Sequence, residues 1–397
     1  MQENSFDTAA ITADWGFPNQ MLVGPGRLSE LPALCHEIGI ARPLLVTDTG
    51  LRALPIIDDT LAALRDGGLT VALFADVQGN PVEANVDAGI AAYRAGNHDG
   101  VVAIGGGSAL DVAKAIALMV GQRRPIWDFE DLGDNWKRAD AEAIAPVIAI
   151  PTTAGTGSEV GRASVVTNQA TRRKVIVFHP RMLPRAVILD PEVTVGLPAP
   201  ITAATGLDAF IHCFEAWCAP GFHPMADGIA LQGMRLIATA LPRAYRDGSD
   251  LEARTHMLAA ASMGALAFQK GLGAVHAIAH PVGALYGTHH GQTNAIILPY
   301  VMRFNREAIV DRIAPVAWAL GLADDSFETL MDWVLRFREQ LGIPHTLADL
   351  GVDTRRAEEI GRLAAADPPA ASNPVAVGAK ELSQIFIQAV EGGNQES

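Results

Sequence analysis

The sequence predicts an α/β fold class: an N-terminal domain with a parallel sheet covered by helices, followed by an all-helical C-terminal domain. In the first half of the 397 residues, short β-branched runs alternate with helical stretches. These runs mostly stop after residues 197–200, and Ala, Leu, Met and Ile then recur at helical spacing. We therefore divide the chain into residues 1–195 and 196–397, and this length suits two domains.

The first domain contains apolar, Val- and Ile-rich runs that are expected to form buried strands. The expected strands cover residues 43–47, 70–75, 100–104, 146–150 and 185–189, and the expected helices between them cover residues 58–66 and 82–95. Strands that alternate with helices pair in parallel, because each helix carries the chain back to the start of the next strand.

The second domain has helical periodicity, most clearly over residues 226–241 and 255–268, and residues 392–397 are expected to form a frayed tail. No apolar run reaches the ~18 residues of a membrane-spanning helix. Residues 1–14 lack the basic start of a signal peptide. The three cysteines, Cys35, Cys213 and Cys218, form no CxxC pair, which favours a reducing compartment and core thiols. We expect a cytoplasmic protein.

The composition is acidic, with a formal net charge of −14. Phosphate backbones and anionic lipids attract clustered Lys and Arg, so this charge argues against a nucleic-acid partner and against docking on a membrane. With nucleic acid and membranes disfavoured, we expect the partner to be a small molecule.

Two glycine-containing loops follow strands of the expected sheet. The first runs through Gly105, Gly106, Gly107 and Ser108 into a helix, where backbone N–H groups and the helix N-terminus can approach a phosphate closely. It lacks the GxGxxG spacing and the P-loop Lys, so a tight strand-to-helix turn is the alternative. The second loop, residues 151–160 (PTTAGTGSEV), interleaves hydroxyl side chains with glycine. Both loops should meet at the carboxyl edge of the sheet, where open α/β sheets bind ligands.

Asp48 ends the first expected strand, at the same edge of the sheet. Its carboxylate could accept hydrogen bonds from the ribose hydroxyls of a dinucleotide and would repel a 2′-phosphate, which favours NAD over NADP. A turn or N-cap role is the alternative, because Thr47-Asp48-Thr49-Gly50 is also good turn chemistry.

Four of the eleven histidines lie close together in the sequence, at His276, His280, His289 and His290. His276 and His280 share a helix face, and Pro281 is expected to disturb or end that helix. Upstream, Asp208 and His212 also share a helix face in apolar surroundings, where a carboxylate needs a partner. One carboxylate and three imidazoles suit Fe²⁺, Zn²⁺ or Mn²⁺, whereas a buried Asp–His ion pair is the alternative.

Four motifs occur together in this order: residues 105–114 (GGGSALDVAK), 151–160, 206–212 (GLDAFIH) and 273–291 (GAVHAIAHPVGALYGTHHG). Because it carries these four motifs in this order, the chain resembles the iron-containing (group III) alcohol dehydrogenases, which have a dehydroquinate-synthase-like fold. Residues 294–305 and 367–374 are also similar to that family.

The resemblance implies an oxidoreductase that transfers a hydride between NAD(H) and a small alcohol or aldehyde at a divalent metal, Fe²⁺ most commonly and Zn²⁺ in some members. It implies metal ligands at Asp208, His212, His276 and His290, and a proton-relay role near the nicotinamide for His280. The cofactor cleft between the domains is implied to be lined by Asp48, Gly105, Gly106, Gly107, Ser108, Asp111, Thr152, Thr153, Thr156, Ser158 and Lys174. A homodimer or larger homo-oligomer is implied as well.

Two positions depart from the family pattern. Gly161 stands where many members carry Thr, so a hydroxyl contact is lost, and His289 stands where many have Pro. Three other functions remain open: a metal- and NAD-dependent lyase or synthase of the dehydroquinate-synthase type, a maleylacetate-reductase-like enzyme, and a metal-storing or regulatory binding protein. The intact Asp and His set and the two loops favour the alcohol dehydrogenase.

Overall fold

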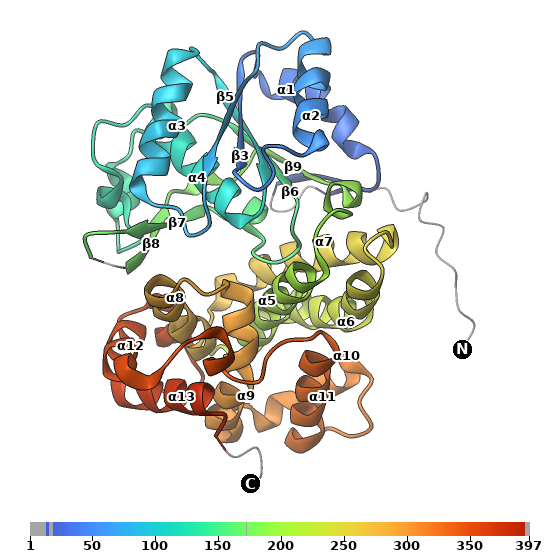
Figure 1. Ribbon diagram of the computed structural model, residues 1–397, viewed down its shortest axis with the longest axis vertical. Coiled ribbons are helices and arrows are strands. Elements are labelled where there is room, and N and C mark those ends of the chain that lie inside the picture. The colour runs from blue at the N-terminus through green and yellow to red at the C-terminus, as the bar shows by residue number, and fades with distance from the viewer. Residues whose placement is uncertain (1–12, 16–18, 172, 394–397) are drawn as a thin grey trace. The chain divides into compact units, whose positions relative to one another are not determined.

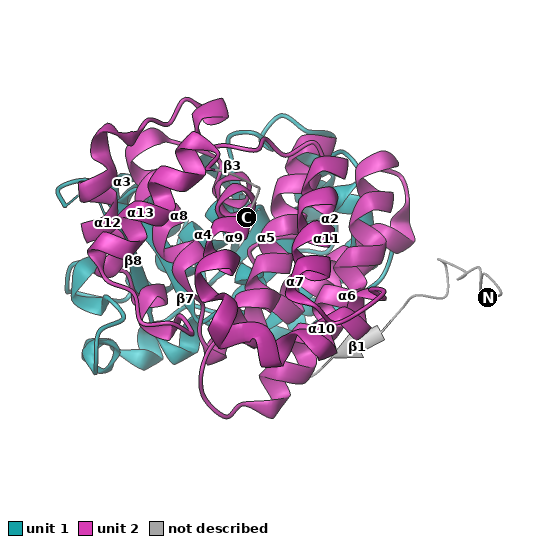
Figure 2. Cartoon of the chain, turned by 90° about the horizontal axis from the view of Figure 1, so that it is seen from below, with its two compact units in different colours: residues 1–153, 157–197 teal, residues 154–156, 198–397 magenta. Residues whose placement is uncertain are grey.

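The computed structural model describes residues 13–15, 19–171 and 173–393 of the chain (Figure 1). By its internal contacts the chain divides into two compact units (Figure 2). Unit 1 contains residues 1–153 and 157–197, and unit 2 contains residues 154–156 and 198–397. The sheets belong to unit 1, and the regular elements described in unit 2 are all helices.

Unit 1 is built on a seven-stranded sheet with the order β1-β2-β9-β6-β5-β3-β4. Neighbours from β2 to β4 pair in parallel, and β1 is antiparallel to β2. The strands are β1 (Ala13–Trp15), β2 (Gln20–Val23), β3 (Pro43–Asp48), β4 (Ala72–Val77), β5 (Gly100–Gly105), β6 (Val147–Pro151) and β9 (Ala186–Leu189). The central strands β3, β5 and β6 are buried along almost their whole length, which explains their continuous apolar sequence. The predicted fold class is confirmed.

Four α-helices of unit 1 lie between these strands in the chain. They are α1 (Leu31–Ile38), α2 (Pro55–Asp66), α3 (Glu83–Ala95) and α4 (Gly107–Met119). Helix α4 is almost entirely buried, because Ala, Val, Leu and Ile occupy all of its faces. It starts directly after β5, so its N-terminus lies at the carboxyl end of that strand.

A second, two-stranded sheet was not expected from the sequence. It is the antiparallel hairpin of β7 (Ala163–Asn168) and β8 (Arg173–Phe178). Buried and partly exposed residues alternate along β7 and in part of β8, and β8 begins with two basic residues. Such half-buried strands lack the continuous apolar runs by which the central strands were recognised.

Unit 2 is formed by nine described α-helices. They are α5 (Ala199–Cys218), α6 (Pro224–Arg246), α7 (Leu251–Ala267), α8 (Ala274–Tyr286), α9 (His290–Ile309), α10 (Ile313–Leu320), α11 (Phe327–Gln340), α12 (Ala357–Ala365) and α13 (Ala379–Glu391). Helix α5 is buried over almost all of its length and packs against α6, α7 and α9. The core of unit 2 therefore surrounds the helix that carries Asp208 and His212.

The expectation that Pro281 could end its helix was wrong. Helix α8 passes through Pro281 and ends at Tyr286, followed by Gly287 with a left-handed φ of 71°. Proline removes one backbone donor from a helix. Val282 and Gly283, which follow it, are buried in the core, and this packing offsets the lost hydrogen bond.

No single helix in the described part of the chain has both the length and the apolar composition of a membrane span. The segments Leu251–Lys270 and Ala274–Tyr286, bent by 109° at the break between them, reach that composition only as a pair.

Candidate active site

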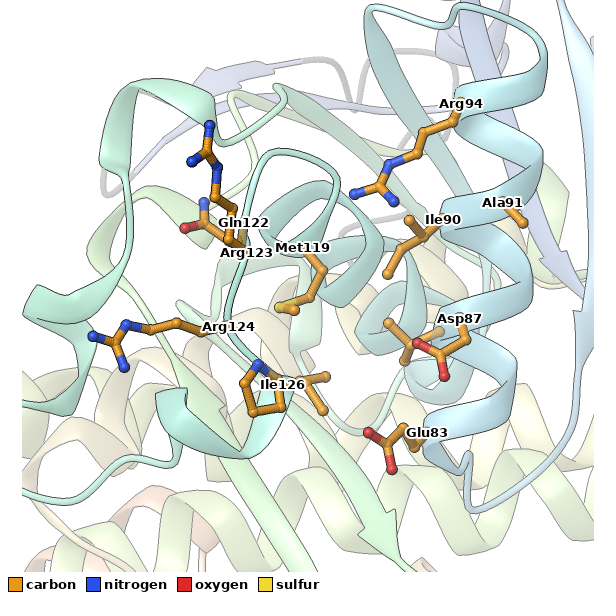
Figure 3. A pocket seen from close by; sticks show the side chains of 12 residues that line it. Glu83, Asp87, Ile90, Ala91, Arg94, Met119, Gln122, Arg123, Arg124 and Ile126 are labelled. Carbon is orange, nitrogen blue, oxygen red and sulfur yellow. The ribbon is translucent and has the colours of Figure 1, made fainter.

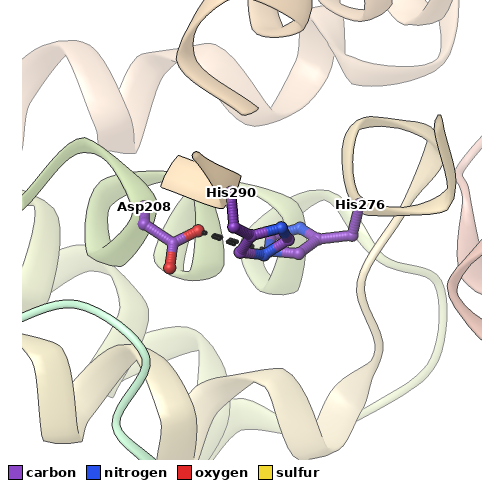
Figure 4. Close-up of side chains that lie close together, drawn as sticks. All are labelled: Asp208, His276 and His290. Atoms are coloured by element: carbon purple, nitrogen blue, oxygen red, sulfur yellow. Dashed lines mark ion pairs between the residues drawn. The ribbon is translucent and has the colours of Figure 1, made fainter. Parts of the chain in front are cut away.

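The four side chains with metal-ligand chemistry come together within unit 2. Asp208 and His212 lie one turn apart on α5, His276 lies on α8, and His290 is the first residue of α9. The Nε2 atoms of His212, His276 and His290 lie 3.9, 3.6 and 3.7 Å from Oδ1 of Asp208. Ligand atoms of Asp208, His276 and His290 all lie within 4.8 Å of one another (Figure 4). Helix α5 and the consecutive helices α8 and α9 thus direct their donors to one point.

The electrostatics of this cluster favour positive charge between its members. Burial raises the pKa of Asp208, but the surrounding imidazoles outweigh it and hold that pKa well below its usual range. Burial lowers the pKa of His212 to about 4, so its ring is neutral at pH 7. Burial also lowers the pKa of His276, yet hydrogen bonds to Asp208 and Glu215 raise it to about 9. An ionised carboxylate therefore faces imidazole nitrogens that attract a proton or a cation.

Glu215 contacts His276 and was missed in the sequence analysis. The Nδ1–H of His276 donates to Oε2 of Glu215 at 2.6 Å, and the backbone N–H of Val275 donates to Oε1 at 2.8 Å. This contact fixes the tautomer of His276 and turns its Nε2 toward Asp208. The spacing on α5 could have indicated Glu215, because it follows Asp208 by seven residues and so lies on the same helix face.

Asn294 was also missed. Its Nδ2 lies 2.7 Å from Oδ1 of Asp208, 3.2 Å from Nε2 of His276 and 3.1 Å from Nε2 of His290. The signal here was the separation of four residues between His290 and Asn294 on α9, which places both on one face.

His280 lies on α8 one turn after His276, and its ring stacks on that of His290 at a centroid distance of 5.4 Å. Its Nδ1 is 3.0 Å from Oδ2 of Asp367. Asp367 begins the sequence 367–374, whose family resemblance was noted without assigning a role to any residue. Asn373, in the same stretch, accepts the backbone N–H of Ala274 at 3.1 Å and so holds the start of α8.

The glycine loop of unit 1 takes the strand-to-helix form that the sequence predicts. Gly105 has a φ of 155°, and a Cβ there would lie 2.6 Å from Cβ of Ala109 and 3.1 Å from Oδ2 of Asp48. Gly106 caps α4, and no side chain caps the first amides of that helix. The backbone therefore remains accessible where α4 begins, as anion binding at a helix N-terminus requires.

The second loop lies beside the first. The backbone N–H of Thr152 donates to Gly105 at 3.0 Å, and the Thr153 side chain lies 3.5 Å from the Cβ position of Gly106. Asp48 accepts the backbone N–H groups of Gly50 and Leu51 through Oδ1, which is the turn role named as its alternative. The expectation that both loops meet at the carboxyl edge of the sheet is met.

Other residues predicted to line the cofactor site connect the second loop to the hairpin. Oδ1 of Asp111 accepts from Oγ of Ser158 at 2.5 Å, and Oδ2 accepts from the backbone N–H of Val165 at 2.9 Å. Buried Lys114 donates to the backbone oxygens of Ser158 and Ala163. Asp111 and Ser158 thus have clear structural contacts within unit 1.

Three further positions complete the placement of the predicted residues. Lys174 pairs with Thr167 in the hairpin, and Thr156 belongs to the short segment that clusters with unit 2. His289 is the N-cap residue of α9.

A surface hollow of about 410 Å³ lies in unit 1 between α3 and the residues that follow α4 (Figure 3). Its lining carries charges of both signs, among them Glu83, Asp87, Arg94 and Arg124. None of the site residues named from the sequence lines it, so it forms no part of the candidate active site.

Comparison with known proteins covers nearly the whole chain. The family described as "Iron-containing alcohol dehydrogenase" matches residues 18–191, and "Fe-containing alcohol dehydrogenase family, C-terminal" matches residues 202–390. A 4-hydroxybutyrate dehydrogenase from Cupriavidus necator is 40% identical over 377 residues, covering 92% of this chain and 96% of that protein. An NAD-dependent methanol dehydrogenase from Bacillus methanolicus is 35% identical over 380 residues, with 94% and 98% covered.

A solved structure of 1,3-propanediol oxidoreductase is similar in fold, with a TM-score of 0.86 and 37% identity. The similarity covers 92% of this chain and 96% of that one.

Proposed function

Because the chain belongs to the iron-containing alcohol dehydrogenase family and is therefore an oxidoreductase, we propose that it transfers a hydride between NAD(H) and a small alcohol or aldehyde at a divalent metal. The observation that carries this proposal is the convergence of Asp208, His276 and His290 beside His212. Unit 2 would bind metal and substrate, and unit 1 would bind the dinucleotide.

The residues of the cluster fit a divalent cation. A carboxylate and imidazole nitrogens are ligand atoms that Fe²⁺ and Zn²⁺ accept, and no described cysteine thiol joins them. We propose that Asp208, His212, His276 and His290 hold Fe²⁺, with Zn²⁺ as the alternative. When bound, the cation supplies Lewis-acid polarisation of the substrate oxygen and the nicotinamide supplies hydride exchange.

The chain's own residues would orient the donors and move the proton. Glu215 holds Nε2 of His276 toward the other ligands. The Nδ1 of His280 faces the carboxylate of Asp367, so its Nε2 would accept the proton released on alcohol oxidation and return it on aldehyde reduction.

For the cofactor, we propose that the diphosphate binds at the N-terminus of α4, against the backbone of Gly105, Gly106, Gly107 and Ser108. Asp48 would accept the ribose hydroxyls through its second oxygen, which supports NAD over NADP. The proposed lining residues are Asp111, Thr152, Thr153, Thr156, Ser158 and Lys174.

The other functions have weaker support. A lyase or synthase acting on phosphorylated substrates would need a basic substrate pocket, whereas the surroundings of Asp208 and His212 are apolar. A maleylacetate-reductase-like enzyme that works without metal has no need of the converging ligands, and a storage protein has no need of two dinucleotide-type loops. We also propose a cytoplasmic location and a homodimer or larger homo-oligomer.

The test is the replacement of His276 by alanine. It should abolish both metal retention and turnover, because the ligand set loses a buried donor, while NAD binding is mostly kept. Elemental analysis of the purified protein measures the bound metal. Nicotinamide absorbance measures turnover with a panel of short alcohols and with maleylacetate, using both NAD and NADP. A H276A protein that keeps its metal and its rate would contradict the ligand assignment.

A further inference from the structure

The carboxamide of Asn294 contacts three of the four proposed ligands at once. Its Nδ2 lies 2.7 Å from Oδ1 of Asp208 and 3.2 and 3.1 Å from Nε2 of His276 and His290. The residue is fully buried, and among the described residues its Oδ1 has no hydrogen-bond partner. The buried carboxamide of Asn294 therefore contacts the proposed ligands through its Nδ2 donor only.

The chemistry of these contacts makes them compete with a cation. A neutral imidazole Nε2 has a single lone pair, which accepts an N–H or binds a metal ion but does not do both. The carboxylate of Asp208 has further lone pairs and can serve both partners. The hydrogen bond from Asn294 to His290 is therefore excluded once that ring binds a cation.

We propose that Asn294 is a positioning residue that holds the metal-facing lone pairs of Asp208 and His290 with its two N–H groups and gives up the imidazole to the cation. This inference rests on the proposed metal site. Without the cation, the acceptor atoms of Asp208 and His290 face each other in a buried space, and the two N–H groups of Asn294 keep them satisfied and correctly turned. Asn294 would therefore stabilise the metal-free form and weaken metal binding.

The discriminating variant is Asn294→Leu, which keeps a branched side chain of similar size but removes the donors. The metal-free form loses the hydrogen bonds to Asp208 and His290, whereas the metal-loaded form loses at most the contact with Asp208. We therefore expect N294L to bind metal roughly tenfold more tightly than the wild type. A residue that ligates through its amide oxygen would give the opposite sign.

The measurement is a titration of the chelator-treated full chain with Co²⁺, followed by the visible absorption of the bound ion and by competition with a chelator. The matched control is Asn19→Leu, which also removes a buried amide. In the described part of the chain, Asn19 donates to the backbone oxygens of Glu159 and Pro184 rather than to a ligand. N19L should bind Co²⁺ as the wild type does.

Equal or weaker Co²⁺ binding by N294L would overturn the inference. If N294L does not fold, judged by circular dichroism, Asn294→Ala replaces it, and the same comparison of affinities decides. The gap between the melting temperatures of the metal-free and Co²⁺-loaded forms should also be wider in the variant than in the wild type.

Failure of the proposed metal site looks different from failure of this inference. A wild-type protein that binds no Co²⁺, or an H276A variant that binds it undiminished, would refute the site itself. Wild-type binding that is lost in H276A but not strengthened in N294L would refute only the role of Asn294.

Discussion

The carboxylate of Asp367 accepts the Nδ1–H of His280, and the two side chains come from segments far apart in the chain. This contact fixes the tautomer of His280 and leaves Nε2 free to exchange a proton. We expect Asp367→Asn to lower kcat about tenfold and to change the KM for alcohol little, because the proton acceptor is misaligned while the proposed metal ligands remain. Steady-state kinetics of the metal-loaded enzyme measure the changes in kcat and KM separately.

A double-mutant cycle with His280→Gln supplies the control. If Asp367 acts through His280, the D367N substitution should have little further effect in the H280Q background. Additive losses, or a change confined to KM, would count against the positioning role.

At the same scale, the sequence indicated the clustered Asp and His side chains better than the residues that contact them. Asp208 with His212 and His276 with His280 share helix faces and can be paired by spacing alone. Asn294 and Asp367 act through side-chain contacts whose partners lie 86 and 87 residues away. A local pattern could pair Asn294 with His290, four residues before it, but only tertiary packing brings Asn294 to Asp208 and Asp367 to His280.

At the scale of elements, the buried strands and helices were predictable, whereas the hairpin of β7 and β8 was not. The hairpin is held to α4 by buried Lys114, whose pKa is lowered by burial, and by Asp111. Sequence periodicity carries no information on such interior contacts between elements. Pro281 makes the same point, because α8 continues through it and ends only at Tyr286, before Gly287.

Gly161, at the start of this hairpin, offers a test of that connection. Its φ and ψ of −91° and 146° suit a β-branched residue, and a Cβ there would lie 3.6 Å from Nζ of Lys114 without a close clash. We expect Gly161→Thr to raise the free energy of unfolding by about 0.5–1 kcal/mol, because the unfolded chain loses conformational freedom. Denaturant unfolding measures it.

Gly68, with a φ of 83°, is a control position at which the same substitution should have the opposite effect on stability. Gly68→Thr should destabilise the protein, because a β-branched residue is strained at positive φ. A G161T protein no more stable than the wild type would mean that the added side chain disturbs the loop.

At the scale of the whole molecule, the free cysteines link the core to the pH dependence of stability. Burial raises the pKa of the Cys213 and Cys218 thiols from 9.0 to about 12. The unfolded chain loses these protons near pH 9 while the folded protein keeps them, so the stability they contribute is complete below pH 9 and lost as the pH rises toward 12. Each thiol should lower the free energy of unfolding by up to about 1.4 kcal/mol per pH unit in that window.

Urea unfolding between pH 8 and pH 10.5 measures this dependence, with dithiothreitol present to keep the thiols reduced. The variant Cys213→Ala/Cys218→Ala should be less stable at pH 8, because it loses buried volume, but its stability should fall less steeply above pH 9. Thiol reagents should label the native protein slowly at pH 8 and the unfolded chain rapidly, since the reactive thiolate forms only when the core opens. If the free energy of unfolding fell equally steeply above pH 9 in both proteins, groups other than these two thiols would cause the loss of stability at alkaline pH.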